Sequence, residues 1–276
     1  MITLFRILSV LPLWLMHGLG WLLGWLVFGV SGLYRRRFLA NARQAGYTPA
    51  QWLGAVGQAG CLVTELPRLW LGRPVRIHWD GAQHVEAALA RGTGIVFLTP
   101  HLGCFEITAQ AYAGRFGSRQ PMTVLFRPAR KTWLRGLIDS ARWRPGLYTA
   151  PTTMAGVKQL LKALRQGQSV GLLPDQVPPH GLGVWAPFFG RAAYTMTLSA
   201  RLAQQTGAAV LVAWGERLAW GRGYTVHVKP FAEQLPADAV QAATDINQAM
   251  AQLIAECPQQ YLWGYARYKQ PRQDGH

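Results

Sequence analysis

An uncharged apolar run near the N-terminus most constrains how this chain can fold. No Asp, Glu, Lys or Arg lies between Ile7 and Leu33, and the run includes LPLWLMHGLGWLLGWLVFGV. About 20 apolar helical residues cross a hydrocarbon core of roughly 30 Å, so this run is long enough to do so. We therefore predict a membrane anchor over residues 1–34 and one further domain over residues 35–276. The sequence leaves open whether the helix spans the bilayer, lies in its plane or packs as a buried hairpin. A cleavable signal peptide fits less well, because its apolar region is usually only ~7–15 residues long.

Positive charge follows the apolar run and continues through the chain. Arg35, Arg36 and Arg37 would keep this end of a membrane helix on the cytoplasmic side. The formal net charge is +16, and Arg6 is the only charged residue before Arg35, so +15 remains for residues 35–276. This excess implies an anionic partner. No zinc-finger spacing, RRM signature or helix-turn-helix pattern is present, so the sequence favours anionic lipid over nucleic acid.

The rest of the chain alternates between short apolar runs and helical patterns. Strands are predicted within GIVFLTP (94–100), MTVLF (122–126), SVGLL (169–173), AAVLVAWG (208–215) and YTVHVK (224–229). Helical patterns occupy 49–71, 103–115, 131–141, 154–166, 194–206 and about 238–256. Such alternation predicts an α/β fold with a largely parallel sheet and flanking helices. In these sheets, ligands bind beyond the carboxyl ends of the strands.

A histidine and a glutamate follow the first of these strands, in the sequence TPHLGCFE. If His101 ends the loop and Glu106 enters the next helix, the carboxylate can reach one imidazole nitrogen. The carboxylate then orients the ring, and the other nitrogen can take a proton. The spacing alone is a weak signal, because a solvent-facing His and a favourable Glu at a helix N-terminus share it. A competing idea makes Cys104 a nucleophile activated by His101, although a cysteine in such an apolar position is usually a packing residue.

Four further motifs follow the His-x4-Glu pair. They are FRPARK (126–131), LLPDQ (172–176), VWAPFFGR (184–191) and CPQQYLWGYARYK (257–269). Together the motifs resemble those of the bacterial lipid A biosynthesis acyltransferases, the late or secondary lauroyl/myristoyl acyltransferases. The HxGxxE-type signature of that family matches His101, Gly103 and Glu106. Its arginine before proline matches Arg127, and its PD[QH] aspartate matches Asp175. Two departures are Cys-Phe in place of Asn-Trp before the glutamate, and WGYARYK in place of W-x-H-R-R-[FW]-K.

The resemblance implies a fold of the glycerol-3-phosphate acyltransferase type and a bacterial inner-membrane enzyme with its acyltransferase domain, residues 35–276, on the cytoplasmic side. The implied reaction moves an acyl chain from acyl carrier protein or coenzyme A to a hydroxyl of a hydroxyacyl chain on a lipid A precursor. No metal or redox cofactor is required. The rival functions are acyl transfer to another glycolipid or aminolipid, and non-catalytic tethering to anionic lipid.

The resemblance also assigns roles to individual residues. His101 would be the general base, and Glu106 would support the charged imidazole. Arg127 would stabilise the oxyanion or hold an anionic group. Asp175 would order Arg127 or the loop from Pro174 to Arg191, or would be a plain turn aspartate beside Pro174. Further basic residues that could bind phosphates or an acidic carrier protein, or could equally be ordinary solvated side chains, are Arg130, Lys131, Arg135, Arg142, Arg144 and Arg191.

Overall fold

A seven-stranded sheet forms the centre of the computed structural model, which describes residues 2–126, 144–231 and 234–272. The strand order is β1-β9-β8-β2-β5-β3-β4. The strands are β1 (Ile77–Asp80), β2 (Ile95–Leu98), β3 (Met122–Phe126), β4 (Leu147–Pro151), β5 (Ser169–Leu172), β8 (Ala209–Arg217) and β9 (Tyr224–Pro230). Every neighbouring pair is parallel except β8 with β9. The predicted α/β fold with a largely parallel sheet is confirmed.

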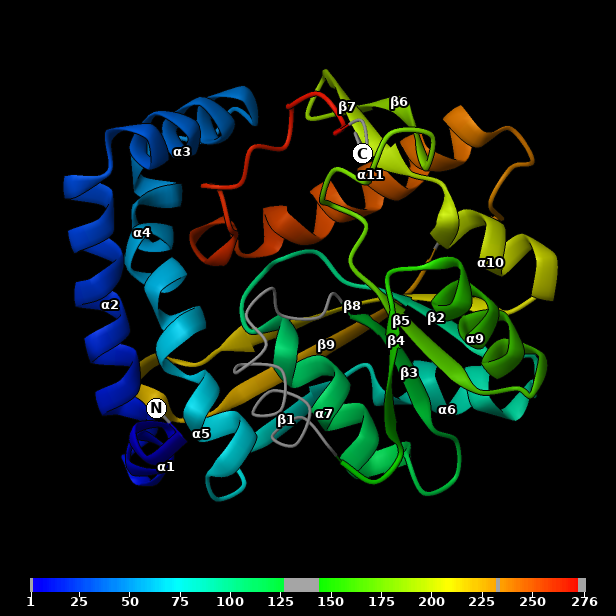
Figure 1. Cartoon of the computed structure of the whole chain (residues 1–276), viewed down its shortest axis with the longest axis horizontal. Coiled ribbons are helices and arrows are strands. Elements are labelled where there is room, and N and C mark those ends of the chain that lie inside the picture. The colour runs from blue at the N-terminus through cyan, green and yellow to red at the C-terminus, as the bar shows by residue number, and fades with distance from the viewer. Residues whose placement is uncertain (1, 127–143, 232–233, 273–276) are drawn as a thin grey trace.

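Helices cover both faces of this sheet (Figure 1). On one face lie α6 (Ala82–Ala90) and α7 (Phe105–Phe116), and on the other lie α9 (Met154–Arg165), α10 (Leu198–Thr206) and α11 (Ala239–Glu256). Along β2, Phe97 packs toward α7, whereas Leu98 packs into the cluster that includes α9, α10 and α11. Because both faces are covered, the central strands β2, β3, β5 and β8 are mostly apolar, which explains why the runs were visible in the sequence.

Five helices precede the first strand: α1 (Ile2–Val10), α2 (Leu13–Val30), α3 (Gly32–Gln44), α4 (Pro49–Thr64) and α5 (Leu66–Leu71). Figure 1 shows α2 and α4 side by side along one edge of the molecule. Their backbones approach closely, since a Cβ added at Gly24 would meet the Val56 carbonyl, and one added at Gly60 would meet the Gly20 carbonyl.

Among the described residues, α2 is the one helix long and apolar enough to cross a bilayer. Its outer side exposes Leu22, Leu26 and Val30. Its inner side contributes buried Leu13 and Met16. The predicted apolar helix is therefore present, and it packs along the domain; that residues 1–34 form a membrane anchor separate from residues 35–276 stays a prediction.

Several elements differ from the sequence prediction. The helix expected over 49–71 is divided at Glu65 into α4 and α5, with Pro67 in the first turn of α5, where a helix tolerates proline. The helix expected over 194–206 begins only at Leu198, because β7 (Arg191–Met196) pairs with β6 (Gly183–Phe188) in a separate hairpin. The helix expected over 131–141 lies outside the described residues.

Four strands were missed, namely β1, β4, β6 and β7. The strands β1 and β4 are short edge strands, with partly exposed side chains that weaken the apolar signal. The β6–β7 hairpin turns at Phe189 and Gly190, which both have positive φ, as expected of a two-residue type I′ connection. Phe189 is an uncommon residue for such a turn, so the sequence carried little warning of it.

Candidate active site

His101 and Asp175 meet because two parallel strands are neighbours in register. Leu98 of β2 pairs with Leu172 of β5. His101 comes three positions after Leu98, and Asp175 comes three positions after Leu172. His101 Nδ1–H donates to Asp175 Oδ1 at 2.6 Å, and the His101 backbone N–H donates to Oδ2 at 2.8 Å. The site therefore lies just beyond the carboxyl ends of the two strands, where α/β sheets bind ligands.

The Asp175 carboxylate is buried and ionised. Burial by itself would raise the pKa of Asp175, but the electrostatic attraction of the His101 side chain and the two hydrogen bonds from His101 lower it below its ordinary value. The Tyr261 hydroxyl also donates to Oδ2, at 3.2 Å. An ionised Asp175 keeps the proton of His101 on Nδ1, so that Nε2 is the nitrogen that can accept a proton.

The Nε2 side of His101 faces the neighbouring loop residue and a cavity. The side-chain amide of Gln176 donates to Nε2 at 2.9 Å. The Phe105 ring packs against the imidazole edge-on, with the ring centroids 4.9 Å apart. Glu106, in the first turn of α7, lines the same cavity.

Hydrogen bonds of both imidazole nitrogens thus go to the 175–176 loop. The carboxylate on Nδ1 is that of Asp175, where the sequence had favoured Glu106. The structure does not show the predicted His-x4-Glu pairing. The role of Glu106 stays a prediction, and so does the effect of Asp175 on Arg127.

The turn after His101 is tightly held by backbone contacts. Gly103 has a φ of +58°, and a Cβ there would collide with the Gly215 carbonyl. The Gly103 N–H donates to the Gln260 carbonyl at 3.0 Å, and the Leu262 N–H donates to the His101 carbonyl at 3.1 Å. The segment around η2 (Pro258–Gln260) therefore clamps the turn from one side.

A cavity of about 1060 Å³ opens beside His101. Beneath α7, neighbouring strands each contribute a wall residue in sheet order, namely Val124, Gly171, Phe97, Ala213 and Val226. Past the strand ends, the cavity continues between side chains of α9 and α10. The walls are mostly apolar, with His101, Glu106 and Gln176 among the polar groups at the strand ends, a composition typical of sites for apolar ligands.

A family model described as bacterial lipid A biosynthesis acyltransferase matches residues 63–270, about three quarters of the chain. The chain belongs to this family. The matched region includes both loops of the site, β2 with His101 and β5 with Asp175. Family membership makes the protein an acyltransferase of lipid A biosynthesis and confirms the predicted resemblance.

Named relatives agree with this family. A lipid A biosynthesis palmitoleoyltransferase and a lipid A biosynthesis lauroyltransferase, both from Escherichia coli K12, are each 26% identical over 215 residues, covering 76% of this chain and 68% of the relative. A phosphatidylinositol mannoside acyltransferase from Mycobacterium tuberculosis H37Rv is 28% identical over 185 residues, covering 64% of this chain and 55% of the relative.

The basic residues proposed from the sequence fall into two groups. Arg127, Arg130, Lys131, Arg135 and Arg142 lie outside the described residues. Among the described ones, the Arg144 guanidinium donates to the Leu69 and Trp70 carbonyls at 3.0 and 2.8 Å. Arg191, on β7, stacks over the Tyr268 ring with 4.7 Å between guanidinium and centroid. Neither Arg144 nor Arg191 is among the described residues that line the cavity.

Cys104 of the acyltransferase is a buried side chain at the start of α7. Burial raises the pKa of its thiol well above the ordinary value, and the Glu65 carboxylate raises it further. A reactive cysteine needs the opposite, a lowered pKa and an accessible thiol. Among the described residues, no group of three His, Cys, Asp or Glu side chains is arranged to hold a metal ion.

Sequence reasoning missed Gln176 and Tyr261 and did not find the contact between His101 and Asp175. One signal was available: each strand is followed by one residue, a proline and then the polar residue, as Thr99-Pro100-His101 and Leu173-Pro174-Asp175. Equal offsets bring two residues together only if their strands are adjacent in register. The sequence alone did not show that adjacency.

Proposed function

We propose that this protein transfers a fatty acyl chain from a thioester, carried by acyl carrier protein or coenzyme A, to a hydroxyl of a hydroxyacyl chain on a lipid A precursor. The observation that carries the proposal is an imidazole oriented by a buried carboxylate at the edge of a large apolar cavity. The site would act on the cytoplasmic side of the bacterial inner membrane.

The proposed reaction is direct transfer. His101 Nε2 removes the proton from the acceptor hydroxyl, taking the hydrogen-bonding position that the Gln176 amide now occupies. The alkoxide oxygen attacks the thioester carbonyl, and the ester forms as the carbon–sulfur bond breaks. The Asp175 carboxylate stabilises the imidazolium through Nδ1. The proton can then pass from Nε2 to the departing sulfur.

No further group is needed to assist the leaving thiol, whose pKa is about 8.5 if it resembles free cysteine. The substrate hydroxyl supplies the nucleophile, so the enzyme needs neither a serine nor a cysteine for that purpose. We propose that Glu106 helps to hold the acceptor at the cavity wall. Arg127 remains the proposed oxyanion or anion-binding group, and Arg130, Lys131 and Arg135 remain candidates for phosphate or carrier binding.

The cavity suits the acyl chain of the donor. Wall residues from five neighbouring strands form an apolar path across the sheet beneath α7, and this path begins near His101. A chain lying there would bring its thioester carbonyl to the imidazole. Burial of each methylene group contributes about 0.8 kcal/mol, so the apolar wall supplies much of the binding free energy.

The N-terminal helices support a membrane location. The outer side of α2 is apolar and exposed, and Arg35, Arg36 and Arg37 follow in α3. Anionic lipid attracts such juxtamembrane basic residues by about 1 kcal/mol each. The bilayer would then present the lipid acceptor to the site.

The acceptor can be tested against its rival, because one relative is named for acylating a phosphatidylinositol mannoside. Purified full-length protein would be incubated with labelled acyl thioesters, of either acyl carrier protein or coenzyme A, and with either lipid A precursor or phosphatidylinositol mannoside. We expect acylated lipid A precursor, identified by mass spectrometry. Transfer to the mannoside alone would reassign the acceptor.

His101→Ala is the control for this experiment. Loss of the general base should lower the rate by about 10²- to 10⁴-fold while the protein stays folded. If wild-type protein bound anionic vesicles but transferred no acyl chain to either acceptor, the non-catalytic tethering function would replace the proposed one.

A further inference from the structure

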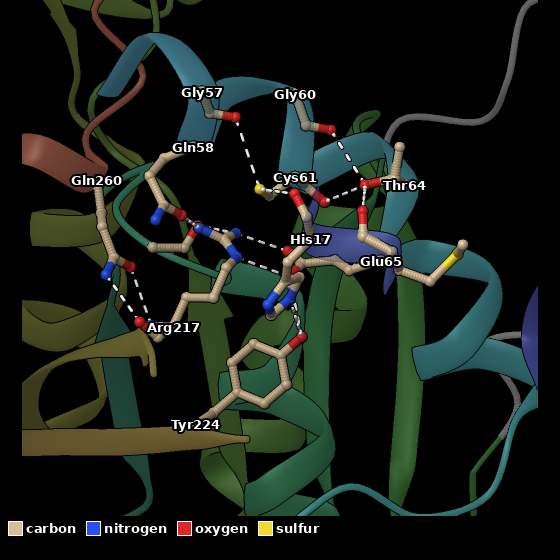
Figure 2. A network of polar contacts seen from close by, with 12 residues as sticks. His17, Gly57, Gln58, Gly60, Cys61, Thr64, Glu65, Arg217, Tyr224 and Gln260 are labelled. Atoms are coloured by element: carbon tan, nitrogen blue, oxygen red, sulfur yellow. Dashed lines mark hydrogen bonds and ion pairs between the residues drawn. The ribbon is translucent and has the colours of Figure 1, made fainter. Parts of the chain in front are cut away.

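A buried polar cluster, shown in Figure 2, contacts the turn that follows His101 through the Gly103 carbonyl. Its centre is the ion pair between Glu65, where α4 meets α5, and Arg217 at the end of β8. The guanidinium makes two parallel bonds, Nε–H to Oε2 at 2.7 Å and Nη2–H to Oε1 at 2.6 Å. Both side chains are almost completely buried.

Two more side chains, those of Tyr224 and His17, contact the Glu65 carboxylate. The Tyr224 hydroxyl of β9 donates to Oε2 at 2.9 Å, and His17 Nε2 of α2 lies 3.1 Å from the same oxygen. Burial alone would raise the pKa of Glu65, but Arg217 above all, and also His17, lower it to about 2. The carboxylate is therefore charged, and it holds Arg217 in one orientation.

Arg217 also forms hydrogen bonds with Gly103 of the catalytic turn and with Gln58 and Gln260 beside it. Nη2–H also donates to the Gly103 carbonyl at 3.2 Å, and Nη1–H donates to Gln58 Oε1 at 2.6 Å. The Arg217 backbone N–H donates to the Gln260 amide oxygen, and the Gln260 amide donates back to the Arg217 carbonyl, both at 2.9 Å. Figure 2 shows Arg217 between Gln260 and Glu65.

These contacts hold both backbone polar groups of Gly103, its carbonyl and its N–H. The Gly103 carbonyl accepts from the Arg217 side chain, and the Gly103 N–H donates to the carbonyl of Gln260, whose amide is itself bonded to Arg217. Gly103 is two residues after His101 and has a backbone conformation that few other residues adopt. A change in the peptide on either side of Gly103 would therefore move the imidazole relative to Asp175.

A requirement for stability alone explains this cluster poorly. Removing two charges from water costs several kcal/mol per ion, and well-packed apolar side chains often stabilise a core equally well. What apolar side chains lack is directed hydrogen bonding. The planar guanidinium can bond the Glu65 carboxylate and the Gly103 carbonyl at once, which a lysine ammonium does with less geometric control.

We propose that Arg217, held by Glu65, is a positioning residue for acyl transfer. It acts through Gly103 and Gln260 and does not touch substrate. Its contact orients the turn so that His101 Nε2 faces the acceptor hydroxyl while Nδ1 stays on Asp175. The proposal rests on the proposed function, in which His101 is the base.

The test uses full-length protein and three variants. Arg217→Met removes the charge and the fork, Arg217→Lys keeps the charge but loses the fork, and Tyr224→Phe is the matched control. Tyr224 is buried and bonds the same Glu65 oxygen, and within the described part of the chain its hydroxyl contacts Glu65 and His17 but not the turn. For each protein, kcat and KM for acyl transfer would be measured together with hydrogen exchange of peptides that cover residues 99–106 and 258–264.

We expect kcat to fall about 10- to 100-fold in Arg217→Lys, with both KM values within about threefold, because a small misplacement of the reacting groups costs rate more than binding. Exchange should rise in both peptides. Tyr224→Phe should lose stability but keep kcat and the exchange of these peptides near the wild-type values. If Arg217→Met does not fold, Arg217→Lys decides.

The two readouts separate this proposal from the proposed function. Exchange does not depend on transfer, so a wild-type protein without acyl transfer would overturn the proposed function and leave the exchange comparison to decide whether Arg217 holds the turn. Wild-type kcat and exchange in Arg217→Lys would overturn the positioning role. The positioning role would also be overturned if hydrogen exchange of the two peptides rose as much in Tyr224→Phe as in Arg217→Lys.

Discussion

At the scale of single residues, the proposed role of His101 depends most on the Asp175 carboxylate. In Asp175→Asn, the amide replaces an ionised carboxylate that stabilises the imidazolium and fixes the tautomer. We expect kcat to fall by about 10²-fold or more, with little change in KM. Glu106→Gln should cost less, since both imidazole nitrogens bond the 175–176 loop. Steady-state kinetics on both variants would check this order, and a larger loss in Glu106→Gln would restore Glu106 as the main partner of His101.

Cys104 offers a second test at a single position. Its thiol is buried, with a pKa raised by burial and by Glu65, so we expect it to pack and not to react. Cys104→Ser should keep transfer within a few-fold, apart from a modest loss of stability. Intact-mass measurement after incubation with donor alone should show no acylated protein. An adduct formed at the rate of turnover, and lost in the variant together with transfer, would establish an acyl-enzyme.

Gly171 is expected to influence which chain lengths fit. It lies on β5 between Phe97 and Val124 of the neighbouring strands, and all three residues line the cavity. In Gly171→Leu, the kcat/KM ratio of long to short acyl donors should fall at least about tenfold, because filling an apolar pocket discriminates by methylene groups. The control is Val170→Leu, one residue earlier, whose side chain packs on the opposite face of the sheet. An unchanged ratio in Gly171→Leu would place the acyl chain elsewhere.

At the scale of elements, the close packing of α2 on α4 depends on glycine. A Cβ at Gly24 would lie near the Val56 carbonyl oxygen and 3.0 Å from the Gly57 Cα, whereas a Cβ at Gly18 of the same helix would meet nothing within 4 Å. Gly24→Leu should therefore destabilise the protein by about 2 kcal/mol or more, as overpacking does, while Gly18→Leu changes little. Thermal unfolding in detergent would compare them. Equal midpoints would mean that α2 does not pack on α4 in solution.

The break between α4 and α5 shows how an element serves the site from a distance. Proline at the second position of α5 favours a new helix start, and the residue at the junction, Glu65, turns its carboxylate inward to Arg217. A continuous helix over residues 49–71, as the apolar pattern predicted, would have placed Glu65 in mid-helix. The local irregularity and the buried charge belong together.

For the molecule as a whole, acid should unfold the protein partly through Glu65. The pKa of Glu65 falls from 4.5 to about 2 in the folded state. A lowered folded pKa means that the stabilisation is complete above pH ~4.5 and is lost as the pH falls toward 2. A shift of this size corresponds to about 3 kcal/mol. Asp175, whose pKa is also lowered, adds to the loss in the same direction.

Glu65→Gln provides the comparison for this prediction. The variant should be less stable at neutral pH, because Arg217 loses its charged partner, and its stability should depend less on pH between about 4.5 and 2. Unfolding midpoints measured across this range for both proteins would give the two slopes. Parallel slopes would show that other carboxylates cause the acid unfolding.

The sequence predicted most strands of the main sheet, but it did not predict which distant segments come into contact. The strands β2, β3, β5 and β8 were recognisable because each is a mostly apolar run covered on both faces, and β9 because apolar and polar residues alternate along it. The edge strands and the β6–β7 hairpin were not, since their burial is partial or their turn residue is atypical. Local patterns record the surroundings of a segment. They carry no record of its neighbours in space.

The sequence by itself determined the α/β class, a helix of membrane length, the place of His101 after a buried strand and membership of the acyltransferase family. Only the tertiary structure decided which carboxylate serves the imidazole. The order of strands in the sheet sets β2 beside β5, and this adjacency brings Asp175 to His101 although 74 positions separate them. It likewise brings Glu65 to Arg217 across 152 positions. Periodicity reflects contacts within a few residues, whereas these pairings depend on how distant strands and helices pack around one core.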